Sequence, residues 1–244
     1  MADPRDLFDL TGRVACITGA SAGLGRRAAV ALEAAGAKVV GVARRREALQ
    51  SLQDNSAGRT RIVVADVADR EGTQTLRDAI SAHYGPPDIV VHAAGINPRE
   101  PASDVTTEGW DKTIALNLSA PFFLSQALVP AMQKKGWGRI VNFASLQTFR
   151  AFPGGIAYGA SKAGIAQLTR AMAEAWSQHG ITANAIGPGF FPTELTEAVF
   201  SDPDRAARNA AQTCVQRNGL LEDIDGPLLF LCSKASGFVT GQTL

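Results

Sequence analysis

The sequence predicts an α/β protein: a doubly wound parallel sheet with helices on both faces, in a single domain. Short, almost continuously apolar runs alternate with segments of helical periodicity, as expected for strands that are covered on both sides. A glycine-rich turn follows the first of these runs. The 244 residues fit one large domain, and no linker or internal repeat interrupts them, so we treat 1–244 as one unit.

Six strands and four main helices are expected in alternation, which is typical of a parallel sheet with crossover helices. The strands are expected at Val14–Thr18, Lys38–Ala43, Arg61–Ala65, Ile89–His92, Arg139–Phe143 and Thr182–Ile186. The helical periods are Arg27–Ala35, Thr73–Tyr84, Trp110–Lys134 and Gly159–Ser177. The least regular stretch, 187–217, is predicted to be a lid over a substrate, although a surface insertion with short helices would look the same.

Composition narrows the classes of function. The net charge is +1, and basic and acidic residues are mixed along the chain, so the sequence shows no basic cluster of the kind that binds nucleic acid or a membrane surface. We expect no membrane-spanning helix, because no run of about 18 apolar residues is present, and the polar first ten residues do not resemble a secretory signal. The widely spaced Cys16, Cys214 and Cys232 predict reduced thiols in the cytoplasm. The three histidines are scattered and predict no metal site.

The turn after the first strand predicts a dinucleotide site. Its glycines, Gly19, Gly23 and Gly25, allow a tight turn and a close approach to a pyrophosphate, while the next helix presents free N–H groups to the anion. Ser21 and Leu24 lie in the same turn. A glycine-rich turn that binds nothing is the alternative, which the strand before it and the helix after it disfavour.

The end of the second strand bears on which dinucleotide binds. An acidic residue there holds the ribose 2′-hydroxyl of NAD, whereas arginine accommodates the 2′-phosphate of NADP. This chain has Ala43 followed by Arg44 and Arg45. We therefore expect NADP(H) to be favoured over NAD(H), unless the arginines are only solvated surface charges.

Tyr158 and Lys162 are four residues apart in a helical period, so their side chains share one helix face. A nearby cation favours the phenolate, which would make Tyr158 a general acid/base. The pair alone occurs by chance in many helices. It gains weight here because a nucleotide site precedes it in the chain.

Taken in order, these motifs resemble the short-chain dehydrogenase/reductase family over nearly the whole chain. The matching residues are the glycine turn, Asp66-Val67, Ala93-Ala94-Gly95, Asn117, Ser145, Tyr158, Lys162, Pro188-Gly189 and Thr193. The resemblance implies a Rossmann-type fold and hydride transfer between a nicotinamide dinucleotide and a ketone or secondary alcohol. It further implies that all of these except Asn117 and Ser145 contact the cofactor, with Asp66 at the adenine and Thr193 near the carboxamide.

The resemblance also implies catalytic roles. Tyr158 would exchange the proton, and Ser145 would hydrogen-bond the substrate carbonyl. Lys162 would hold the nicotinamide ribose and lower the pKa of Tyr158. Asn117 would hold a water that links Lys162 to solvent.

Two features depart from the family pattern. His92 stands where the family usually has asparagine, and we expect it to replace that residue structurally rather than to act as a base. The chain also ends at Leu244, soon after the Thr-Gly-Gln segment, so the last strand is expected to be missing or trimmed.

The substrate is expected to be a small carbonyl or alcohol compound, whose identity the sequence leaves open. Gln147, Arg150 and Phe190 are predicted to line its pocket, with Arg150, or alternatively Arg99, binding a carboxylate. The opening segment and the region 95–100 are similar to gluconate 5-dehydrogenases, which favours a sugar acid or polyol. The alternatives are a 3-oxoacyl-carrier-protein reductase, a broad-range carbonyl reductase and, in another class, a non-catalytic dinucleotide sensor.

A homodimer or homotetramer is expected. Ile165, Leu168, Met172 and Trp176 form one apolar stripe, and Phe122–Met132 is also strongly apolar. The family resemblance implies pairing of these two helices across a two-fold axis. Alternatively, both stripes face the sheet.

Overall fold

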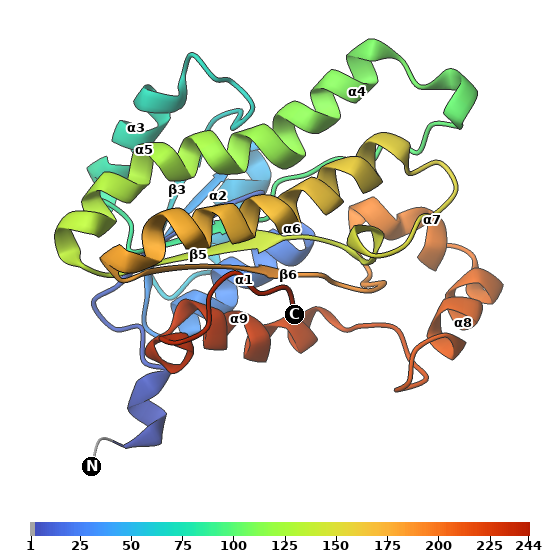
Figure 1. The fold of residues 1–244 in the computed structure, drawn as a ribbon. Helices are drawn as coiled ribbons and strands as arrows, with labels where there is room; N and C mark the ends of the chain where they lie inside the picture. The colour runs from blue at the N-terminus through green and yellow to red at the C-terminus, as the bar shows by residue number, and fades with distance from the viewer. Residues whose placement is uncertain (1–2) are drawn as a thin grey trace.

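Six parallel strands form one sheet in the order β3-β2-β1-β4-β5-β6. The computed structural model describes residues 3–244 (Figure 1). The strands are β1 (Val14–Thr18), β2 (Lys38–Ala43), β3 (Thr60–Val64), β4 (Ile89–His92), β5 (Gly138–Phe143) and β6 (Ile181–Ile186). All six expected strands are confirmed, with bounds shifted by at most one residue.

Helices cover both faces of the sheet, because successive side chains of each strand point to opposite sides. In β1, Ile17 belongs to the core shared with α1 (Gly23–Ala34), α2 (Arg46–Asp54) and α9 (Asp225–Cys232). The neighbouring Cys16 belongs to the core shared with α3 (Thr73–Tyr84), α5 (Ala120–Lys135) and α6 (Ile156–Trp176). Figure 1 shows α5 and α6 on one side of the sheet and α1 and α9 on the other. The doubly wound prediction is therefore confirmed.

The strand order reverses between β1 and β4, where the chain crosses from one half of the sheet to the other. In open sheets of this kind, the loops at the carboxyl ends of these two strands diverge and leave a crevice. The fold therefore places the glycine turn after β1 next to the loop 93–95 after β4.

The long helical period expected over Trp110–Lys134 is not a uniform α-helix. It consists of α4 (Thr107–Ile114), a π-helical segment Ala115–Ser119, and α5. By length and composition alone, Thr107–Lys135 could cross a membrane, which contradicts the expectation that no such stretch exists. However, core helices of soluble proteins pass the same test, and α5 buries Leu124, Leu128 and Met132 against the sheet.

Part of the apolar stripe of α6 faces the sheet. Ile165 and Met172 are buried, while Leu168 and Trp176 pack against the same core. In the preceding helix, Leu128 is buried in the same way. The sheet therefore accounts for the buried part of both stripes, while Phe122, Leu168 and Trp176 are only half-buried, and the oligomer stays a prediction.

The last residues run beside β6. Thr243 forms a parallel bridge with Ala185, whose N–H donates to the Gln242 carbonyl at 2.8 Å. The Leu244 carbonyl accepts a hydrogen bond from the Gly187 N–H at 2.7 Å. Residues 242–244 thus lie where a further strand would pair with β6, and the single bridge there agrees with the expectation of a trimmed strand rather than a missing one.

We predict that Leu32→Ala destabilises the protein by about 2–5 kcal/mol, because it leaves a cavity where α1 packs on the sheet. Leu32 is completely buried, whereas Val30 on the same helix is 43% exposed. The matched control Val30→Ala should change the free energy of unfolding by less than about 1 kcal/mol. Urea unfolding measures both, and equal losses would contradict this account of the core.

Candidate functional site

A cleft of about 620 Å³ opens at the carboxyl ends of the strands, at the point where the strand order reverses. Every residue predicted to contact the cofactor lines it. These are Gly19, Ser21, Gly23, Leu24, Gly25, Arg44, Arg45, Asp66, Val67, Ala93, Ala94, Gly95, Tyr158, Lys162, Pro188, Gly189 and Thr193. The fold therefore gathers into one cleft a set that is spread over most of the chain.

The glycine turn is shaped by backbone contacts that leave no room for side chains. Gly19 has a φ of 71°, and a Cβ there would lie 2.7 Å from the Ala94 nitrogen. A Cβ on Gly25 would lie 2.3 Å from the Gly19 carbonyl oxygen. Glycine is thus required at both positions for β1 and α1 to approach the loop after β4.

The N-terminus of α1 fits an anionic group. No side chain caps it: Ala22 stands at the N-cap, and no acidic residue lies in the first turn. The first N–H groups of a helix lack partners within the helix and carry partial positive charge. Because this end lines the cleft, the site fits the pyrophosphate of a dinucleotide.

Both predicted phosphate-binding arginines lie at the cleft and are paired with carboxylates. Arg44 lies 3.7 Å from Asp66. Arg45 donates to both carboxylate oxygens of Glu194, each at 2.9 Å, and to the Ser21 hydroxyl at 3.2 Å. Sequence reasoning missed Glu194, because it lies 149 positions from Arg45 and belongs to no motif.

The candidate acid/base Tyr158 lines the cleft and is 8% exposed. Burial raises the pKa of its phenol above the ordinary value, although a hydrogen bond with Ser145 and the charge of Arg99 lower the pKa in part. Ser145 lies two residues beyond β5 and accepts a hydrogen bond from the Gln147 N–H at 3.1 Å. The serine and tyrosine hydroxyls are therefore adjacent.

Lys162 lies one turn from Tyr158 on α6, and its ammonium is 5.6 Å from the centre of the Tyr158 ring. It donates to the Phe143 carbonyl at 2.6 Å, and burial lowers its pKa to about 8. Burial is the largest influence on the pKa of Tyr158 in this structure, and the effect of Lys162 on that pKa stays a prediction.

Asn117 does not line the cleft but holds the loop that forms its wall. Its side chain exchanges two hydrogen bonds of 2.9 Å with the backbone of Ile96 and donates to Ser161 at 3.1 Å. A Cβ on Gly95 would lie 3.2 Å from the Asn117 side-chain oxygen and 3.8 Å from the Lys162 nitrogen. The π-helical segment thus places Asn117 near Lys162, with Gly95 between them.

His92 lies away from the cleft. Its Nε2 is 2.8 Å from the Ser125 hydroxyl on α5, and burial lowers its pKa to about 3, so the ring is neutral. It therefore joins β4 to α5. The Ala94 N–H instead donates to Thr18 at 3.3 Å, which connects the ends of β4 and β1.

The cleft contains Gln147 and Phe190, which are predicted to line the substrate pocket, but not Arg150. The Arg150 guanidinium lies 4.8 Å from the Phe152 ring and lines an adjoining depression, which shares Gln147 and Phe152 with the cleft. Arg99, the alternative named from the sequence, does line the cleft. Its guanidinium donates to the Leu195 carbonyl at 3.0 Å.

The first part of the segment 187–217, together with Arg205, lines one side of the cleft. The segment contains η6 (Glu194–Thr196), α7 (Glu197–Phe200) and α8 (Pro203–Ala211). Thr193 approaches the glycine turn so closely that a Cβ on Gly23 would lie 3.1 Å from its methyl group. The segment therefore lies next to the predicted pyrophosphate site.

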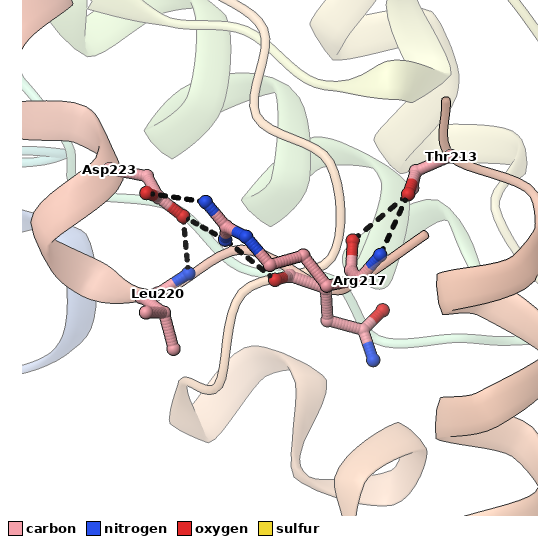
Figure 2. A network of polar contacts seen from close by, with 5 residues as sticks. Thr213, Arg217, Leu220 and Asp223 are labelled. Atoms are coloured by element: carbon pink, nitrogen blue, oxygen red, sulfur yellow. Dashed lines mark hydrogen bonds and ion pairs between the residues drawn. The ribbon is translucent and has the colours of Figure 1, made fainter. Parts of the chain in front are cut away.

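The far end of this segment is fixed by a polar network, shown in Figure 2. Arg217 pairs with Asp223, whose carboxylate also accepts the Leu220 N–H at 2.8 Å, and Thr213 bonds the Arg217 backbone. The bond from Arg217 lowers the pKa of Asp223 to about 2. The Gly219 N–H then donates to the Phe190 carbonyl at 2.9 Å, so the two ends of the segment meet.

Comparison with known proteins agrees with this geometry. Residues 19–244 match a family model described as enoyl-(acyl carrier protein) reductase. Gluconate 5-dehydrogenase of Gluconobacter oxydans is 38% identical, with 98% of this chain and 94% of the relative covered. The 3-oxoacyl-[acyl-carrier-protein] reductase of Escherichia coli is 35% identical, with 97% and 96% covered.

A solved structure is also closely similar. The gluconate 5-dehydrogenase from Burkholderia cenocepacia, in complex with NADP and tartrate, superposes with a TM-score of 0.92 at 34% identity, covering 99% of this chain and 96% of that one. Together with the cleft and its Ser145, Tyr158 and Lys162 set, these similarities show that the chain belongs to the short-chain dehydrogenase/reductase family of NAD(P)-dependent oxidoreductases.

Proposed function

We propose that this oxidoreductase interconverts a ketone and a secondary alcohol on a sugar acid, with NADP(H) as the favoured cofactor. The observation that carries the proposal is the placement of Arg99 near Tyr158: its charge reaches the phenol, and it lines the same cleft. A guanidinium there suits a substrate that has a carboxylate near the reacting carbon. The relatives named gluconate 5-dehydrogenase support this choice.

When bound, NADP(H) supplies or accepts the hydride. In reduction, Tyr158 donates its proton to the carbonyl oxygen, and Ser145 donates a hydrogen bond that stabilises the negative charge developing there. Lys162, Arg44 and Arg45 supply positive charge for the cofactor, and the segment 187–217 acts as the lid that excludes water.

We also propose a cytoplasmic homodimer or homotetramer. Phe149 is 69% exposed and Ile156 is 48% exposed, both near the start of α6, and they offer an apolar surface that the sheet does not cover. Cys16, Cys214 and Cys232 are unpaired, in keeping with a reducing compartment. Light scattering distinguishes the oligomer from a monomer.

Tyr158→Phe should lower kcat by about 10²–10⁴-fold, because the proton donor is lost while the ring still fills its place. Cofactor affinity should be retained. Lys162→Ala should lose both rate and cofactor affinity, because the lysine contributes to binding as well. Stopped-flow turnover and fluorescence titration measure the two effects, and normal turnover in Tyr158→Phe would contradict the mechanism.

Tyr158 should titrate above its ordinary pKa of 10.0 in the cofactor-free protein, because burial disfavours the phenolate. The protonated form is then retained at neutral pH, so the proton needed for reduction is present there and is lost only at alkaline pH. The chain has two tyrosines, so the ultraviolet difference between wild type and Tyr158→Phe isolates this one from Tyr84. A titration near neutral pH would show that burial does not dominate.

Arg99→Ala should raise KM for gluconate by about 10- to 100-fold, because a charged hydrogen bond is lost. The same change should alter KM for a neutral polyol by less than about threefold. Arg150→Ala is the matched control and should leave KM unchanged, since its side chain lies outside the cleft.

A comparison of two ketones separates the sugar-acid proposal from its nearest alternative. Faster reduction of an acetoacetyl thioester than of 5-ketogluconate would favour an acyl reductase, for which Phe152 and Phe190 provide an apolar wall in the cleft. The match to the acyl-carrier-protein reductase of Escherichia coli is the observation that keeps this alternative in view.

A further inference from the structure

Glu194 forms an ion pair with Arg45, one of the two arginines that are expected to bind the cofactor's 2′-phosphate. Its two carboxylate oxygens each accept a hydrogen bond of 2.9 Å from Arg45. Glu194 belongs to the segment 187–217, whereas Arg45 stands at the N-cap of α2. The pair therefore joins two distant parts of the chain that both line the cleft.

The guanidinium of Arg45 has two edges that can each bind an anion through paired donors. One edge, formed by the two terminal nitrogens, faces Glu194. The other, formed by Nε and one terminal nitrogen, faces the Ser21 hydroxyl at 3.4 and 3.2 Å. A hydroxyl can turn and donate to an incoming phosphate, but a carboxylate can only accept and repels it.

Both arginines predicted to bind the 2′-phosphate already have a carboxylate partner. Arg44 is paired with Asp66 at 3.7 Å and Arg45 with Glu194, while the other cations of the cleft are Arg99, Lys162 and Arg205. The side chains of Arg45 and Glu194 are 51% and 65% exposed, and an ion pair this exposed contributes little to stability. Glu194 can therefore be displaced, but its charge opposes the anion that displaces it.

We propose that Glu194 is a cofactor-specificity residue, which competes with the 2′-phosphate for Arg45 and so weakens NADP(H) binding without weakening NAD(H) binding. The proposal rests on the proposed dinucleotide function. NAD(H) carries a 2′-hydroxyl, which does not need Arg45 to be free. The difference in affinity between NADP(H) and NAD(H) is accordingly smaller than two arginines without carboxylate partners would give.

The test is fluorescence titration of NADPH and NADH with wild type, Glu194→Gln and the control Glu197→Gln. Glu197 is an exposed acid in the same segment that does not line the cleft. Glu194→Gln should tighten NADPH binding about 10-fold, as expected for removal of one partly screened charge near a dianion. NADH affinity should change less than about twofold, and Glu197→Gln should alter neither.

A second arm links the effect to Arg45. In an Arg45→Gln background, Glu194→Gln should no longer tighten NADPH binding, because the contested group is gone. Unchanged or weaker NADPH binding in Glu194→Gln overturns the proposal, and so does an equal gain for both cofactors, which would indicate a general effect of the segment. If the wild-type protein binds neither dinucleotide, the proposed function is overturned as well. If it binds NADPH, the proposed function stands whatever the effect of Glu194→Gln.

Discussion

The close approach of the glycine turn to the loop after β4 is the constraint on which the site depends. A side chain on Gly19 would meet the backbone of Ala93 and Ala94, and one on Gly25 would meet the Gly19 carbonyl. These contacts fix the start of α1 beside the reversal of strand order, so its free N–H groups lie at the cleft. The cofactor-binding and catalytic candidates are arranged around that point.

Burial sets the chemistry of the proposed catalytic groups. Tyr158 and Lys162 both lose solvent when α6 packs on the sheet, and each is shifted towards its uncharged form. A neutral phenol is a proton donor, and a lysine with a pKa of about 8 can exchange protons near neutral pH. Packing therefore raises the pKa of Tyr158 and favours the protonated phenol that reduction needs, while the charge of Arg99 lowers that pKa.

Local patterns were sufficient to predict the strands, the glycine turn and the two arginines after β2, because each depends on residues that are close in sequence. The other residues that line the cofactor cleft, such as Asp66 and Thr193, were expected only from the resemblance to the family. The positions of Arg99 and Arg150 were not predictable in this way: both follow strands, but only tertiary packing turns one into the cleft and the other out of it. The same holds for Glu194, whose partner Arg45 is remote in sequence. The apolar stripe of α6 did not reveal what it packs against, because a helix that packs on a sheet and one that packs on a partner helix need apolar residues at the same positions.

The π-helical segment Ala115–Ser119 has a consequence for how the chain can vary. An α-helix completes a turn in about 3.6 residues, whereas a π-turn holds about one residue more in the same rotation. Deleting one residue within this segment would therefore restore a regular α-helical turn and keep α4 and α5 in phase, so that Leu124, Leu128 and Met132 stay on the sheet. The position of Asn117 within the wide turn would be lost instead, so the extra residue serves the site rather than the core.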